Sequence, residues 1–166
     1  MRLIRTVAAA TLAAAAVSSG WATTASAEPY PPALAGPVPL NGTYRATSDG
    51  AWAKLNHQMH NQETVTSTWT ITTTCTTPVD CAGTVSSDQG WSAPIVLRSG
   101  MWLVTRNIEN WEQCPDGTAF PGRQQFKFYQ APEDLKGWDE TTGPSGACGA
   151  NLWLVIDMPF TLVRVD

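Results

Sequence analysis

Positive charge is scarce in this sequence. The 166 residues include 10 lysines and arginines against 14 aspartates and glutamates, which gives a formal net charge of −4. Arg2 and Arg5 lie in an N-terminal segment that we expect to be removed, so the mature chain is more acidic still. Proteins that bind nucleic acid or anionic lipid surfaces display clustered lysine and arginine. The composition therefore excludes a nucleic-acid partner and a basic membrane-binding patch.

The N-terminal apolar run is too short to anchor the chain in a membrane. Val7–Val17 falls below the roughly 20 residues that a membrane-spanning helix needs. Two arginines precede this run and the small residues Ala25-Ser26-Ala27 follow it, an order typical of a secretory signal. We predict a cleavable Sec-type signal peptide over residues 1–27, cut after Ala27. The mature protein is expected in the extracellular space or cell wall and does not span the membrane.

Common catalytic motifs are missing as well. The sequence has no G-x-S-x-G nucleophile elbow, no glycine-rich phosphate loop and no dinucleotide fingerprint. The two histidines, His57 and His60, stand with Glu63 in an amide-rich segment, which favours a solvated surface over a metal site. We therefore predict a non-catalytic protein that uses no metal and no cofactor.

A carboxylate-based hydrolase is the alternative, because paired carboxylates can hydrolyse glycosides. Asp157 interrupts an otherwise apolar strand, where its pKa can shift, and Arg106 on another predicted strand is its expected partner. The carboxylates available to this alternative are Asp88, Glu109, Glu112, Asp116 and Asp157.

Four cysteines follow the predicted cleavage point, and an even number in an exported chain predicts disulfides. Four cysteines allow three pairings. We favour Cys75–Cys81, which closes a tight turn, and Cys114–Cys148, which ties together two loops before the last strands. A zinc site is disfavoured because no Cys-x-x-Cys pair is present.

The remaining chain is the size of a single domain. Residues 28–40 contain five prolines and no periodic pattern, which predicts a flexible lead. We expect residues 41–166 to form one all-β domain.

Apolar residues in this domain recur with a period of two, as they do in strands. In Glu63–Cys75 threonines alternate with a mainly apolar set, and Leu152–Leu162 alternates in the same way. The one candidate helix is Trp52–Glu63. The other predicted strands are Gly42–Thr47, Gly83–Ser87, Ala93–Arg98, Met101–Ile108 and Arg123–Gln130.

Sequence-adjacent strands joined by turns indicate an antiparallel meander. We predict that it forms a small closed or nearly closed β-barrel. A two-sheet β-sandwich is the alternative.

Tryptophan is abundant, with eight in the sequence and all but Trp21 after the predicted cleavage point. Indole rings stack on sugars and line apolar pockets. We expect Trp69 in the core and predict a secreted binding module whose ligand is a lipid, a small apolar molecule or a glycan. A host-facing surface for protein–protein interaction is the alternative. The candidate ligand-binding residues are Trp52, Trp91, Trp102, Trp111, Trp138 and Trp153.

Several segments resemble small exported proteins of mycobacteria and related actinobacteria that have no assigned function. This resemblance implies an exported location and a shared fold, and it brings no catalytic residues. The segments that carry it are Gly42–Asn56, Trp69-Thr70-Ile71, Cys75, Cys81–Trp91 and Gly143–Cys148.

A second resemblance, at the level of fold, is to lipocalins. Gly42-Thr43-Tyr44 opens the first strand where lipocalins carry Gly-x-Trp, with tyrosine in place of tryptophan. Arg164 lies near the end of the last strand, and the resemblance implies that it packs across the base of a barrel.

Overall fold

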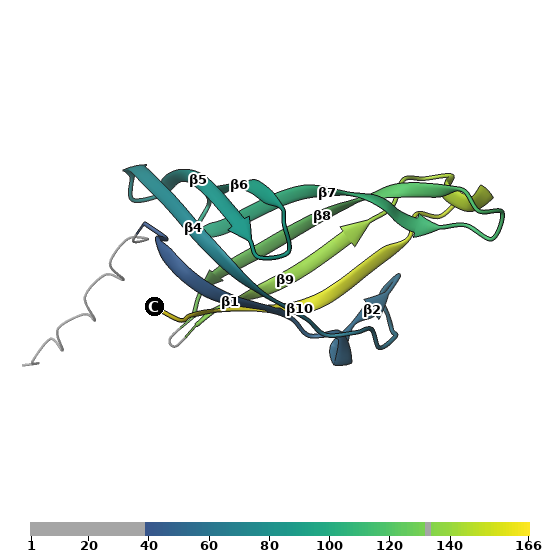
Figure 1. Cartoon of the computed structure of the whole chain (residues 1–166), viewed down its shortest axis with the longest axis horizontal. Coiled ribbons are helices and arrows are strands. Elements are labelled where there is room, and N and C mark those ends of the chain that lie inside the picture. The colour runs from purple at the N-terminus through teal and green to yellow at the C-terminus, as the bar shows by residue number, and fades with distance from the viewer. Residues whose placement is uncertain (1–38, 132–133) are drawn as a thin grey trace, which may run out of the picture. The chain divides into compact units, whose positions relative to one another are not determined.

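The computed structural model describes residues 39–131 and 134–166, which form a closed antiparallel β-barrel (Figure 1). The predicted signal peptide and nearly all of the predicted lead lie outside these residues. Within the described residues, no helix has the length and apolar character that crossing a membrane requires. The strands of the barrel wall are β1 (Gly42–Ser48), β4 (Val65–Thr77), β5 (Asp80–Ser87), β6 (Ser92–Arg98), β7 (Met101–Gln113), β8 (Ala119–Gln130), β9 (Leu135–Thr142) and β10 (Val155–Arg164).

The barrel closes because the first strand pairs with the last. Each wall strand pairs antiparallel with its neighbour in the order β1-β4-β5-β6-β7-β8-β9-β10, and β1 also pairs with β10. That closing pair runs from Tyr44 opposite Arg164 to Ser48 opposite Phe160. The predicted closed barrel is confirmed, and the sandwich alternative is not the fold that the chain adopts.

The predicted helix over Trp52–Glu63 is wrong. This segment instead holds the 3-10 turn η1 (Gly50–Trp52) and the hairpin of β2 (Lys54–Leu55) and β3 (Gln58–Met59). The residues at the hairpin turn, Asn56 and His57, have φ angles of 47° and 69°, which a right-handed helix does not allow. The hairpin continues the sheet beyond Ser48, because β2 pairs with the start of β10.

Strand β9 was not predicted from the sequence. Its inward positions include Gly137 and Asp139, and its outward positions are Lys136, Trp138, Glu140 and Thr142, so no apolar alternation marks it. The glycine is required by packing, since a Cβ atom at Gly137 would overlap the backbone of Lys127 and Phe128 on β8. Because β8 and β9 approach closely at this point, the position requires glycine, and the apolar residue that would have indicated a strand is missing from the sequence.

The last strand follows the predicted alternation over most of its length. Met158, Phe160 and Leu162 point inward and are buried, as the pattern indicated. The strand begins at Val155, however, and Leu152 is 65% exposed in the loop before it. Pro159 sits where β1 leaves β10, so its missing N–H removes no bond to β1 there, and its carbonyl accepts from the N–H of Asp49 at 2.8 Å.

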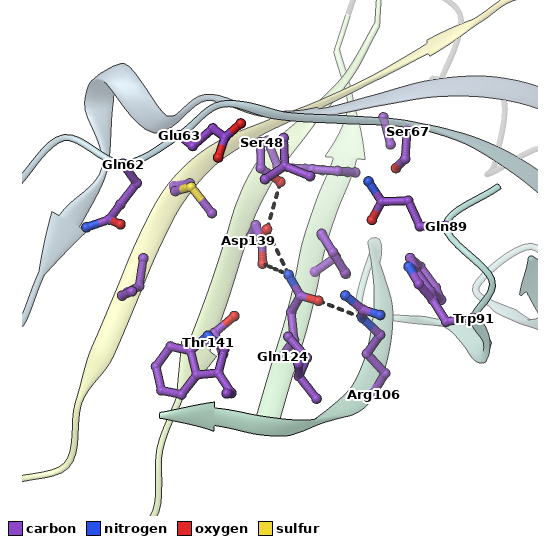
Figure 2. Close-up of a pocket in the computed structure, with 18 of the residues that line it drawn as sticks. Ser48, Gln62, Glu63, Ser67, Gln89, Trp91, Arg106, Gln124, Asp139 and Thr141 are labelled. Carbon is purple, nitrogen blue, oxygen red and sulfur yellow. Dashed lines mark hydrogen bonds between the residues drawn. The ribbon is translucent and has the colours of Figure 1, made fainter. Parts of the chain in front are cut away.

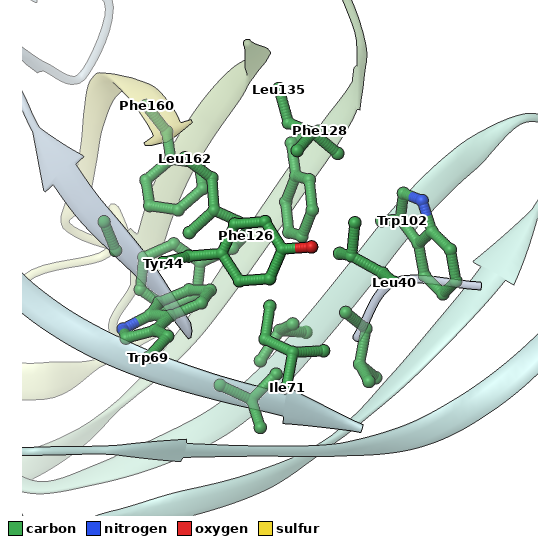
Figure 3. Packing of buried hydrophobic residues seen from close by; sticks show 14 of the residues in the cluster. Leu40, Tyr44, Trp69, Ile71, Trp102, Phe126, Phe128, Leu135, Phe160 and Leu162 are labelled. Atoms are coloured by element: carbon green, nitrogen blue, oxygen red, sulfur yellow. The ribbon is translucent and has the colours of Figure 1, made fainter. Parts of the chain in front are cut away.

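The barrel interior has two parts, a polar-lined cavity (Figure 2) and a packed apolar core (Figure 3). Trp69, Phe126 and Phe160 separate the two, and we call these three residues the aromatic floor. Their ring centroids lie 4.8–5.3 Å apart, the spacing of favourable aromatic contacts. The buried residues of the packed part include Leu40, Tyr44, Ile71, Val85, Ile95, Leu97, Trp102, Val104, Phe128, Leu135 and Leu162.

The base of the barrel is held by residues near both ends of the described chain. Leu40 packs into the core, and its backbone N–H donates to the hydroxyl of Thr73 at 2.7 Å. The guanidinium of Arg164 lies over the ring of Tyr44, 5.9 Å from its centroid. The Arg164 side chain is 59% exposed and its Nε donates to Oδ1 of Asp166 at 2.7 Å, so of the packing that the lipocalin resemblance implied, the structure has this contact with Tyr44.

Both favoured disulfides are confirmed. Cys75 and Cys81 are cross-strand partners in the β4–β5 hairpin, whereas Cys114 and Cys148 join the loop after β7 to the loop before β10. The first bond links residues that the hairpin already holds together. The second closes a far longer stretch of chain.

We predict unequal losses when the two disulfides are removed. The pairs are separated by 34 and 6 residues, so loop-closure entropy assigns roughly 4 kcal/mol to Cys114–Cys148 and roughly 2 kcal/mol to Cys75–Cys81. Urea unfolding of the two double Cys→Ser variants measures the difference. A larger loss from the Cys75–Cys81 variant would contradict this account.

Candidate functional site

The interior changes from apolar to polar one inward position beyond the aromatic floor. On β8, for example, Phe128 and Phe126 are apolar, and the next inward residue, Gln124, is polar and buried. The same change occurs around much of the barrel, so these side chains form a single polar layer. Its members are Ser48 on β1, Ser67 on β4, Arg106 on β7, Gln124 on β8 and Asp139 on β9.

Four members of this layer form a continuous hydrogen-bonded chain (Figure 2). The hydroxyl of Ser48 donates to Oδ2 of Asp139 at 2.7 Å. The side-chain amide of Gln124 donates to both oxygens of Asp139, at 2.8 and 3.0 Å. In turn, Oε1 of Gln124 accepts from Nε of Arg106 at 2.6 Å. Gln124 thus separates a buried carboxylate from a guanidinium while bonding to both.

Among the polar and charged residues that the structure describes, Asp139 is the most deeply buried, with 2% of its surface exposed. Burial raises the pKa of Asp139 above its ordinary value of 3.8, because a charged carboxylate is poorly solvated inside the barrel. The hydrogen bonds from Ser48 and Gln124 and the charge of Arg106 favour the ionised form and limit this rise in pKa. The pKa of Asp139 is therefore the result of two opposing effects: desolvation raises it, and the neighbouring side chains of the polar layer lower it.

Arg106 has a fixed position at the edge of the cavity. Its guanidinium carbon lies 4.4 Å from the ring centroid of Trp91, a cation–π contact, while Nε is bonded to Gln124. Burial lowers the pKa of Arg106, although arginine stays protonated at any physiological pH. Figure 2 shows the guanidinium between Gln124 and Trp91.

Aromatic rings form much of the cavity wall. Trp91 is stacked with Phe126, with centroids 6.3 Å apart and planes 10° from parallel. Trp111 reaches the cavity because β7 is irregular between Ile108 and Glu112, which changes the alternation of its side chains. Gly122 on β8 makes room for this indole, since a Cβ there would lie 2.6–2.9 Å from ring atoms of Trp111.

The resulting cavity has a volume of about 350 Å³. Its mouth includes the exposed Glu63 and the partly exposed Gln62, which lie between the β2–β3 hairpin and β4. The site therefore combines an aromatic floor, aromatic walls and one polar layer. That combination is typical of a pocket for a small organic molecule.

The predicted ligand-binding tryptophans fall in three kinds of place. Trp91 and Trp111 line the cavity. Trp102 is buried in the packed part of the barrel. Trp52, Trp138 and Trp153 are 50–63% exposed and are not among the cavity-lining residues. Trp69, expected in the core, is buried and contributes to the floor.

The groups considered for other chemistry lie elsewhere. Asp157 is 4.0 Å from Nδ1 of His57, and Arg106 bonds to Gln124, so the expected Asp157–Arg106 pair is wrong. The described cavity lining includes Asp139 and Glu63 but none of the five carboxylates that the hydrolase alternative considered. Among residues 39–131 and 134–166, no group of three or more His, Cys, Asp or Glu side chains could hold a metal ion.

Asp139 and Gln124 are the central site residues that the sequence analysis did not single out. Gln124 interrupts the inward series that continues with Phe126 and Phe128, and Arg106 follows Trp102 and Val104 in the same way. A polar residue at a position where the alternation predicts a buried apolar side chain is therefore the sequence signal that could have identified Gln124. Asp139 carried no such signal, since the preceding inward residue is Gly137.

Comparison with known proteins gives a fold relationship only. No family model and no curated protein matches the chain. Among solved structures, the chain is similar to the monomer form of the M. tuberculosis PknI sensor domain, with a TM-score of 0.57 and 22% identity. The match covers 78% of this chain and 89% of that one. It supports the fold, and the neighbour is mycobacterial, as are exported proteins that the sequence resembles.

We predict that Gln124→Leu destabilises the protein by about 3 kcal/mol, because it leaves Asp139 and Arg106 buried without their shared partner. Gln125→Leu is the matched control, since the neighbouring side chain bonds to Thr105 outside the polar layer. The control variant should change the free energy of unfolding by less than about 0.5 kcal/mol. Urea unfolding measures both, and equal effects would show that the polar layer has no special role.

We also predict a pH dependence that belongs to Asp139. A raised pKa means that the folded chain holds this proton to higher pH than the unfolded chain does. The associated stability is present below the ordinary pKa and is lost as pH rises through the raised one. The stability of the wild type relative to Asp139→Asn should therefore fall as pH increases from 3. Urea unfolding across pH measures this difference, and a difference that grows with pH would refute the assignment.

Proposed function

We propose that this protein is a non-catalytic binding module that holds a small organic molecule inside its barrel. The observation that carries the proposal is the cavity above the aromatic floor, with Trp91, Trp111 and Ile108 in its wall and the polar layer among its lining residues. Apolar walls with a few oriented polar groups are the usual composition of small-molecule sites. The half of the barrel below the floor is filled by side chains, so the ligand occupies one end.

The cavity volume narrows the choice of ligand. About 350 Å³ lies near the lower end of the roughly 300–1,000 Å³ range of small-molecule pockets. Among the three ligand classes predicted from sequence, a small apolar or amphipathic molecule fits this volume best. A two-chain lipid or an extended glycan would leave most of its surface outside the cavity.

Two further observations support a role outside the cytoplasm. Both disulfides are formed, and disulfides persist in oxidising compartments such as the extracellular space. The sensor domain of M. tuberculosis PknI has a similar fold. Together with the predicted signal peptide over residues 1–27, these observations support a mature protein that is secreted or retained in the cell wall.

A surface for protein–protein interaction is the second candidate function. The observation that favours it is the exposure of Trp52, Trp138 and Trp153 on the outside of the barrel, where aromatic side chains often anchor partners. This candidate predicts a partner that binds without occupying the cavity. Substitution of these three residues would then abolish capture and leave small-molecule binding intact.

We predict that filling the cavity abolishes small-molecule binding. Ile108→Trp places a large ring in the cavity wall, whereas the matched variant Asn107→Trp places it on the exposed outer face of the same strand. Titration with the neutral fluorophore 1-aminoanthracene should show at least a tenfold weaker affinity for the first variant and no change for the second. That factor corresponds to about 1.4 kcal/mol.

Native mass spectrometry of protein purified from its own culture medium provides an independent test. The wild type should carry a bound small molecule that Ile108→Trp lacks. If wild-type protein is ligand-free and neither variant alters fluorophore binding, the proposed function is wrong.

A further inference from the structure

The wall of the cavity presents hydrogen-bond donors that no described residue satisfies. The bond to Gln124 uses Nε of Arg106, and no residue in 39–131 or 134–166 forms a hydrogen bond to Nη1 or Nη2. The indole Nε1 of Trp91 is buried and likewise has no acceptor among those residues. Donors of buried polar groups are nearly always paired in folded proteins. Trp91 Nε1 is an exception to this rule, whereas Nη1 and Nη2 of Arg106 are not among the buried unpaired atoms and stay open to acceptor atoms that a ligand supplies.

The acceptors in the same layer are already occupied. The two carboxylate oxygens of Asp139 receive three hydrogen bonds, one from Ser48 and two from Gln124. Oε1 of Gln124 is bonded to Arg106. An incoming molecule at this point thus meets donors of Arg106 without a partner and acceptors that each already have at least one.

The free edge of the guanidinium has a defined geometry. Trp91 covers one face of Arg106 at 4.4 Å, and Gln124 holds Nε, so the edge that carries Nη1 and Nη2 is the one left open (Figure 2). This planar edge matches the two oxygens of a carboxylate, which it can bind with two parallel hydrogen bonds. Because protein contacts already fix the side chain, binding orders little that was mobile before.

The charges around the cavity favour an anion with one negative charge over an anion with two. Arg106 is the one cation among the described residues that line the cavity, and Glu63 and Asp139 are its carboxylates. A phosphate group brings nearly two negative charges and would face two carboxylates with one arginine. A carboxylate brings only one charge, so it meets less repulsion from these two carboxylates while it binds the guanidinium.

We propose that the ligand is a small carboxylic acid with an apolar body, an inference that rests on the proposed ligand-binding function. Its carboxylate binds Nη1 and Nη2 of Arg106. Its body lies above the aromatic floor, against the rings of Trp91 and Trp111, which line the same cavity.

The test compares probes that differ only in the acidic group. Phenylacetate, phenylacetamide and phenyl phosphate are titrated into the wild type, with binding measured by calorimetry at neutral pH. The wild type should bind phenylacetate roughly 10- to 100-fold more tightly than phenylacetamide, the range expected for hydrogen bonds between charged groups. Phenyl phosphate should bind more weakly than phenylacetate.

Two variants assign the preference to one arginine. Arg106→Met should bind the acid and the amide equally, and Arg106→Lys should keep part of the preference because it retains charge without the planar edge. Arg123→Met is the matched control, because it removes the same charge from an exposed position on β8 outside the cavity. It should retain the full preference. If Arg106→Met does not fold, Arg106→Lys against Arg123→Met decides the question.

Each contrary result has a distinct meaning. If the wild type binds the acid and the amide equally, the proposed acidic ligand is wrong. If Arg106→Met still prefers the acid, the assignment to Arg106 is wrong. Neither result contradicts the proposed binding function. Tighter binding of phenyl phosphate overturns the assignment to a carboxylate. Absence of binding by all three probes overturns the proposed ligand class, while retained molecules and 1-aminoanthracene binding test the binding function separately.

Discussion

The buried carboxylate of Asp139 is the group on which the geometry of the cavity depends. A charged oxygen pair inside a barrel is unfavourable unless hydrogen bonds replace the lost water. Ser48 and Gln124 provide those bonds from two other strands, and in doing so they fix the amide of Gln124. That amide in turn fixes Arg106. Side chains from four strands are therefore held in one arrangement by a single desolvated group.

The polar layer is costly to stability, and its position limits that cost. An apolar layer of similar volume would avoid the desolvation of Asp139, as replacements of buried ion pairs in other proteins indicate. The cost is confined to one end of the barrel because the aromatic floor of Trp69, Phe126 and Phe160 separates this layer from the packed core. The apolar packing lies below the floor, and the cavity lies above it.

The sequence predicted the barrel because strand alternation and disulfide chemistry are local signals. The Thr-rich strand around Trp69 and the inward series Met158, Phe160 and Leu162 follow directly from a period of two. The helix expected at Trp52–Glu63 failed because composition carries no information about the positive φ angles of the β2–β3 turn.

The candidate site was harder to predict than the fold, because it is defined by contacts across strands. Trp91 and Trp111 were chosen as candidate ligand-binding residues because they are aromatic, and both line the cavity. The same criterion also selected Trp52, Trp138 and Trp153, which lie on the outer surface. Asp139 lies in β9, where Gly137 interrupts the apolar alternation that would identify a strand. Its role depends on Gln124, which is 15 residues away in sequence. Only the pairing of β8 with β9 brings the two together.

The hairpin of β2 and β3 has a consequence for how the molecule behaves among other chains. Where β1 ends at Ser48, β10 would otherwise display unpaired backbone groups, and β2 covers them. Within the described residues the outermost strand of the sheet is then β3, which is two residues long. Open strand edges are the sites at which β-proteins aggregate or recruit foreign strands. At this end of the barrel, β2 therefore closes the segment of β10 that a foreign strand could otherwise pair with.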